Sequence, residues 1–131
     1  MQVRTVIAAL TLFLLCTSAF AQSGGDWPSF RGKAQNTGVA HSPLSTRPSV
    51  RWTYETGSSV ESTAAIVGDR AYVGTMTGAL LAIDMTTGKL RWKYLTGGNA
   101  ISAAPLVQGT RVYVGDQGGV RPLVASPRLD A

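Results

Sequence analysis

The feature that most constrains the fold of this chain is an internal repeat. Residues 51–57 read RWTYETG, and residues 91–97 read RWKYLTG, so the second copy begins 40 residues after the first. The similarity continues downstream, where residues 62–67 (STAAIV) correspond to residues 102–107 (SAAPLV). A period of about 40 residues is typical of repeat architectures, in which each unit buries its faces only against its neighbours.

Residues 1–21 have the pattern of a cleavable signal peptide. Arg4 supplies a positive charge, residues 6–16 form a short apolar run, and residues 19–21 read AFA. The apolar run is shorter than the roughly 20 residues that cross a bilayer, and A-x-A is a cleavage signal. We therefore expect cleavage after Ala21, no transmembrane segment, and a mature protein that is periplasmic or secreted. The alternative is a lipid-modified Cys16, but the small residues expected before such a cysteine are missing.

The composition argues against several classes of site. Cys16 is the single cysteine and lies within the predicted signal peptide, so the mature chain would have neither a disulfide nor a thiolate metal site. The formal net charge is +5, yet the Lys and Arg residues are scattered. Because binding to nucleic acid through phosphate contacts requires a basic stripe or patch, no nucleic-acid partner is expected.

Residues 22–49 are predicted to be an extended N-terminal arm. The segment lacks regular alternation of apolar and polar residues and contains Gly, Pro, Asn and Ser throughout. Two aromatic residues, Trp27 and Phe30, stand three positions apart within it. Buried aromatic side chains contribute strongly to packing, so both are expected to anchor the arm onto the body of the protein.

Residues 50–120 are predicted to form strands joined by tight turns. Short apolar runs alternate with Gly-Asp and Thr-Gly turn pairs, a pattern that favours an all-β fold. The expected strands cover residues 50–56, 62–67, 70–75, 79–84 and 89–96. Four antiparallel strands in about 40 residues make one propeller blade. The prediction is therefore a partial β-propeller, with one complete blade at residues 62–96 and parts of two others.

Residues 50–56 are expected to belong to one of those other blades. We expect this segment to be an outer strand, with Val50, Trp52 and Tyr54 on one face and with its pairing partners outside this chain. At the other end, residues 121–131 depart from the repeat, because Arg and Pro stand where strand residues are expected. This leads to the expectation that the chain is the N-terminal portion of a longer propeller, truncated or read in a shifted frame.

A motif at the end of the complete blade resembles that of a known family. Residues 82–92 read AIDMTTGKLRW, which fits the pattern A-x-D-x-x-T-G-K-x-x-W. A Thr-Gly pair suits a tight turn because Gly tolerates positive φ, and an Asp side chain can cap such a turn. The pattern resembles the tryptophan-docking motif of the pyrroloquinoline quinone (PQQ) repeat family of quinoprotein-type propellers.

The resemblance implies a structural role for this motif. The predicted blade-docking residues are Ala82, Asp84, Thr87, Gly88, Lys89 and Trp92. In the family, the tryptophan stacks on the turn of the neighbouring blade, and its N–H finds a backbone acceptor. Trp52 lies in the earlier copy, which has only the outer-strand half of the pattern.

No catalytic residue is predicted. Glu61 lies in a stretch similar to the one where quinoprotein alcohol dehydrogenases bring a glutamate to PQQ, but a solvated residue at the blade rim is the favoured interpretation. His41 has no cysteine or carboxylate pair with which to build a metal site or a catalytic relay, and Asp84 and Asp116 are interpreted as turn residues. The family's dehydrogenases bind PQQ and calcium with residues from several blades, so no cofactor is predicted unless a full-length quinoprotein exists.

Three interpretations of function remain open. The first is an exported, non-catalytic scaffold or protein-binding module, similar to outer-membrane assembly propellers. The second is the N-terminal part of a periplasmic PQQ-dependent oxidoreductase, and the third is an incomplete gene product with no function of its own. Blades bury their faces against neighbouring blades, so the expected partners are the missing blades, another protein or a second copy of the chain.

Overall fold

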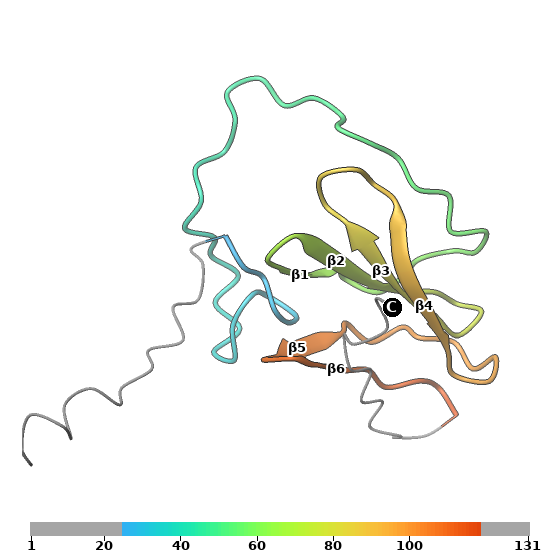
Figure 1. Cartoon of the computed structure of the whole chain (residues 1–131). Coiled ribbons are helices and arrows are strands. Elements are labelled where there is room, and N and C mark those ends of the chain that lie inside the picture. Colours follow the sequence, from blue (N-terminus) through green and yellow to red (C-terminus); the bar gives the residue numbers. More distant parts are fainter. Residues whose placement is uncertain (1–24, 119–131) are drawn as a thin grey trace, which may run out of the picture.

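The computed structural model describes residues 25–118, and this part of the chain consists of two antiparallel sheets (Figure 1). It contains strands and turns but no helix, so none of the described residues forms a helix that could cross a membrane. The strands are β1 (Ala65–Val67), β2 (Arg70–Gly74), β3 (Ala79–Asp84), β4 (Leu90–Leu95), β5 (Leu106–Gln108) and β6 (Arg111–Tyr113). The all-β prediction is confirmed.

The first sheet has the strand order expected for a propeller blade. Strands β1, β2, β3 and β4 follow one another in space as they do in sequence, and each pairs antiparallel with the next. The register places Tyr72 opposite Ala82, and Ala82 opposite Trp92. A bulge between Ala82 and Ile83 interrupts the last pairing, just before the turn into β4. The hairpin of β5 and β6 begins the next unit and lies alongside the first sheet (Figure 1).

The core lies on both faces of β3, the one strand of the first sheet that is buried along its whole length. Successive strand residues point to opposite faces, so β3 contributes to two clusters. One cluster joins the first sheet to the second hairpin and comprises Ala65, Tyr72, Leu80, Ala82, Trp92, Ile101, Val107, Val112 and Val114. The other contains Ala79, Leu81 and Ile83, and the partly buried Trp52 and Tyr54 pack against it. The first sheet is therefore covered by the next repeat on one face and by residues 52–54 on the other.

The first strand of the blade is shorter than predicted. The sequence pattern indicated residues 62–67, whereas β1 begins at Ala65. Ser62 takes the place of a backbone pair, because its Oγ accepts a hydrogen bond from Gly74 N and donates one to Gly74 O, both at 3.1 Å. The Ser62 side chain thus satisfies the backbone N–H and C=O groups of Gly74 at the end of β2 without extending the β1–β2 ladder.

The predicted outer strand over residues 50–56 is not formed within the described residues. The segment belongs to neither sheet, although its side chains alternate between exposed and partly buried along residues 51–56. Trp52 and Tyr54 share a face as predicted, but Val50 is 84% exposed and its placement with them was wrong. A strand needs a backbone partner, and the partners of this segment were expected to lie outside the chain.

The N-terminal arm is held by one of its two aromatic residues. Trp27 is partly buried and forms an isolated antiparallel bridge with Ile66, whereas Phe30 is 55% exposed. The expectation that Phe30 is also an anchor was wrong, because most of its ring surface is not covered by the body of the protein; the guanidinium carbon of Arg31 lies 6.0 Å from the ring centroid. The predicted signal peptide (1–21) and the tail (121–131) lie outside the described residues.

The contact between Gly74 and Ile101 joins the two repeats and leads to a testable prediction. A Cβ added to Gly74 would lie 2.3 Å from Ile101 Cγ2, and Ile101 is fully buried. We expect Gly74→Ala to lower the free energy of unfolding by about 1–3 kcal/mol, the usual cost of overpacking. Urea denaturation measures this change.

A double-mutant cycle supplies the control. Ile101→Ala alone creates a cavity, but it also removes Cγ2, the atom that a new methyl group would meet most closely. The loss in Gly74→Ala/Ile101→Ala should therefore be smaller than the sum of the two single losses. Additive losses would mean that the two residues do not crowd each other.

Candidate functional site

The best-defined polar arrangement of the described residues is the turn between β3 and β4. Asp84 ends β3, and its Oδ1 accepts hydrogen bonds from Thr86 N at 2.9 Å, Thr87 N at 2.7 Å and Thr87 Oγ1 at 3.0 Å. Gly88 closes the turn with φ of 70°, and its N–H donates to Asp84 O at 2.8 Å. The Asp side chain replaces backbone partners that a tight turn cannot supply, and the Gly accepts the left-handed conformation.

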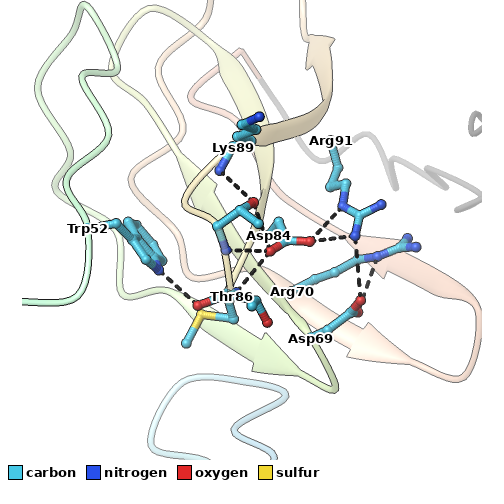
Figure 2. Close-up of polar contacts among 9 residues, drawn as sticks. Trp52, Asp69, Arg70, Asp84, Thr86, Lys89 and Arg91 are labelled. Atoms are coloured by element: carbon cyan, nitrogen blue, oxygen red, sulfur yellow. Dashed lines mark hydrogen bonds and ion pairs between the residues drawn. The ribbon is translucent and has the colours of Figure 1, made fainter.

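A small ion-pair network holds the other oxygen of the same carboxylate. Asp84 Oδ2 accepts hydrogen bonds from Arg91 Nε at 3.0 Å and from Arg91 Nη2 (Figure 2). Arg91 also lies 3.8 Å from Asp69 Oδ2, and Arg70 Nε lies 3.6 Å from Asp69 Oδ1. Asp84 is 5% exposed, so its charge is buried but fully hydrogen-bonded.

These contacts lower the pKa of Asp84 well below its usual range. The backbone hydrogen bond from Thr87 is the largest cause, followed by the side-chain hydrogen bonds from Arg91, while burial acts in the opposite direction. Hydrogen bonds to the charged form stabilise it. Asp84 therefore stays ionised at neutral pH and has its acceptor capacity committed to the turn, an arrangement that suits a structural role rather than proton transfer.

Trp52 docks onto this turn from the opposite side. Its Nε1 donates a hydrogen bond of 2.8 Å to Met85 O, and Figure 2 shows the indole beside the turn. A Cβ placed on Gly88 would lie 2.7 Å from Trp52 Cγ and 2.8 Å from Cδ2, so only glycine allows the ring to lie this close. The contact joins two segments that are 33 residues apart in the sequence.

Trp92 is placed differently from Trp52. It is 7% exposed, and its ring centroid lies 5.9 Å from that of Tyr72 within the cluster between the two sheets. Its Nε1 is buried and has no hydrogen-bond partner among the described residues. Trp52 makes the kind of contact that the resemblance implied for Trp92, stacking on a turn and donating to a backbone carbonyl, and residues 25–118 offer Trp92 no such acceptor. The repeat period contained this information, because Trp52 stands one period before Trp92.

The structure brings most of the predicted docking residues together. Asp84, Thr87, Gly88 and Lys89 form the turn, where Lys89 N lies 3.3 Å from Thr87 Oγ1 and Lys89 O accepts a hydrogen bond from Asp84 N at 2.9 Å. Ala82 is fully buried two positions before Asp84 and faces Trp92 across the β3–β4 ladder. Sequence reasoning missed Met85, Arg91 and Trp52 as members of this site.

The remaining candidates do not assemble a second site. Glu61 is exposed, and His41 Nε2 lies 2.8 Å from Lys33 Nζ on the exposed arm. Asp116 accepts a hydrogen bond from Gly118 N at 2.9 Å, as a turn residue does. Among residues 25–118, no three His, Cys, Asp or Glu side chains cluster closely enough to hold a metal ion.

Comparison with known proteins places this arrangement in context. The profile of the family described as outer membrane protein assembly factor BamB matches residues 36–126. Quinohemoprotein alcohol dehydrogenase ADH IIB from Pseudomonas putida is 40% identical over 73 residues, which cover 50% of this chain and 11% of that protein. The crystal structure of BamB from Moraxella catarrhalis aligns at 30% identity with a TM-score of 0.49, over 53% of this chain and 21% of that one. The chain thus spans a small part of the length of both proteins.

Proposed function

Because the chain belongs to the family described as outer membrane protein assembly factor BamB, we propose that it is an exported, non-catalytic β-propeller module that binds protein. The observation that carries the proposal is the match over residues 36–126, which includes every strand of both sheets. The function proposed from that match is support of protein assembly at the outer membrane. The expected location is the periplasm or the cell exterior, with the mature chain beginning at Gln22.

The chemistry of the docking turn agrees with a structural module. The pKa of Asp84 lies well below its ordinary value, and this shift arises from hydrogen bonds donated by the turn and by Arg91. Perturbed carboxylates mark catalytic sites when they face a cleft, but they also occur in structural ion-pair networks. Here Arg91, Thr86 and Thr87 surround the carboxylate, so the second explanation applies.

The outer strand of the first sheet favours a polypeptide partner. Strand β4 lies at the edge of its sheet and carries Leu90, Tyr94 and Leu95, which are 38%, 39% and 60% exposed. Edge strands with apolar side chains readily pair with further chain. We propose that further propeller blades, another protein or a second copy of the chain covers the surfaces that the two sheets leave open.

A second candidate function is the N-terminal part of a PQQ-dependent oxidoreductase. It is favoured by the 40% identity to a quinohemoprotein alcohol dehydrogenase, and Glu61 would be the residue to contact the cofactor. Glu61 is an exposed carboxylate without the companions that a calcium site requires. PQQ would supply the redox chemistry in such an enzyme, and no step is assigned to residues of this chain.

A gene deletion distinguishes the two candidates. Removing the gene from its own organism should lower the amount of folded outer-membrane β-barrel proteins, measured by the heat-dependent shift of these proteins on gels, and the intact gene should restore it. In parallel, the purified gene product is incubated with PQQ and calcium, and alcohol-dependent dye reduction is recorded. Unchanged β-barrel levels together with PQQ-dependent dye reduction would reject the scaffold and support the oxidoreductase.

A further inference from the structure

Three consecutive residues of the N-terminal arm contact both sheets. Trp27 forms a two-way backbone pair with Ile66 of β1, with Trp27 N donating to Ile66 O at 2.6 Å and Ile66 N donating to Trp27 O at 2.8 Å. The next residue, Pro28, accepts a hydrogen bond from Val107 N of β5 at 2.8 Å. The arm therefore bonds to the backbone of one strand in each sheet.

A third contact extends this set to the turn between β1 and β2. Asp26 Oδ1 accepts a hydrogen bond from Gly68 N at 2.9 Å. Figure 1 shows the beginning of the described chain, in blue, beside β1 and β5. Both strands lie at the edges of their sheets, where backbone groups have no ladder partner on the outer side. Asp26, Trp27 and Pro28 supply partners to both edges at once.

The local sequence prepares the arm for this position. A residue before proline is biased towards extended backbone, so Trp27 is preset for pairing with a strand. The arm then folds back at Gly32, which is buried and has φ of 85°. A Cβ at Gly32 would lie 2.8 Å from Trp27 Cε3, so the indole packs directly against the backbone of this glycine.

We propose that the outer edges of β1 and β5 form a strand-addition site for an extended Asp-Trp-Pro segment, and that Asp26–Pro28 of the same chain occupy it as a clamp. The clamp couples the complete blade to the following hairpin through the backbone, in addition to the side-chain cluster that already includes Ala65 of β1 and Val107 of β5. This proposal rests on the arm contacts alone and is independent of the proposed function.

Amide hydrogen exchange of the full chain, followed by NMR, tests the clamp. Trp27→Ala should accelerate hydrogen exchange at least about tenfold at three amides, those of Ile66, Gly68 and Val107. The acceptors that protect these amides all belong to residues 26–28, which the Trp27 side chain holds in place. The amides of β3 should keep their exchange rates. Phe30→Ala, which alters an exposed aromatic residue of the same arm, should change none of these rates.

A second pair of variants leaves the three clamp residues unchanged. Gly32→Ala forces a methyl group against the Trp27 ring, whereas Gly38→Ala has a similar positive φ of 67° and open space around it. Only Gly32→Ala should accelerate exchange at Ile66 and Val107 together. This pair also tests the clamp if Trp27→Ala fails to fold.

Addition of a peptide tests whether the edges are a binding site. A synthetic peptide spanning residues 24–34, in excess over the Trp27→Ala or Gly32→Ala chain, should restore protection at Ile66 and Val107, and a scrambled peptide should not. The proposal is overturned if Val107 keeps its protection in both variants, if β3 loses protection to the same extent as β1, or if the peptide restores nothing.

Discussion

Gly88→Ala is expected to destabilise the protein by about 2–5 kcal/mol, because two costs fall on one methyl group. The first is the left-handed backbone of Gly88, with φ of 70°, which a residue with a Cβ adopts only at a cost. The second is the indole of Trp52, whose Cγ would lie 2.7 Å from the new Cβ. The ring must then move away from the turn, and the hydrogen bond from Nε1 to Met85 O is lost with it. Urea denaturation gives the free-energy change.

Gly57→Ala is the matched control for this variant. Its φ of 71° is nearly the same, but no atom lies within 4 Å of the added Cβ. It should therefore show the backbone cost alone, about 1–2 kcal/mol. In NMR spectra, the indole N–H of Trp52 should shift strongly in Gly88→Ala and little in Gly57→Ala. Equal destabilisation by the two substitutions would argue against a tight contact between the indole and the turn.

The features that local sequence specifies were predicted well. Strand β3 has the predicted bounds, and β2 and β4 differ from the prediction by one residue at their ends, because Gly-Asp and Thr-Gly pairs mark the turns between them. The capping of the β3–β4 turn by Asp84 also depends on residues within one short segment. Such features follow from backbone preferences that act over a few positions.

Features that depend on distant partners were not predictable in the same way. The alternation over residues 50–56 suggested that Val50 shares a buried face with Trp52 and Tyr54, but Val50 is 84% exposed, because which residues of a segment are covered depends on the surface that it packs against. The shortened β1 results from a hydrogen bond of Ser62 to Gly74, twelve positions away. Likewise, the docking of Trp52 onto Met85 and the bridge of Trp27 to Ile66 join segments that only the folded chain brings together. Composition and periodicity do not specify such pairings.

Asp84→Asn is expected to lower the stability of the protein at neutral pH and to reduce the loss of stability as the pH falls. The amide that replaces the carboxylate loses the charge that Arg91 and the turn N–H groups stabilise, and it lies in the same buried position. Hydrogen bonds to a charged acceptor contribute more than those to a neutral one, and the N–H groups of Thr86 and Thr87 lose that charged acceptor. The midpoint of urea denaturation at pH 7 should therefore fall clearly.

The acid dependence follows from the lowered pKa of Asp84 in the folded protein. An unfolded Asp has a pKa of about 3.9, so above a pH of about 5 both states are ionised and the stabilising contribution is complete. As the pH falls below about 4, the unfolded chain binds a proton that the folded chain resists, and this contribution declines until the folded carboxyl is protonated. The difference in midpoint between the wild type and Asp84→Asn should thus narrow as the pH approaches 2.

Asp69→Asn provides the control, because Asp69 also lies close to Arg91 but its side chain is 62% exposed. Exposed ion pairs contribute at most about 1 kcal/mol, so its midpoint should follow that of the wild type at every pH. If Asp69→Asn lowered the midpoint of urea denaturation as much as Asp84→Asn, the stabilisation would come from negative charge near Arg91 rather than from the capped turn. If the difference for Asp84→Asn did not change between pH 7 and pH 2, the ionised carboxylate would not be what stabilises the docking turn.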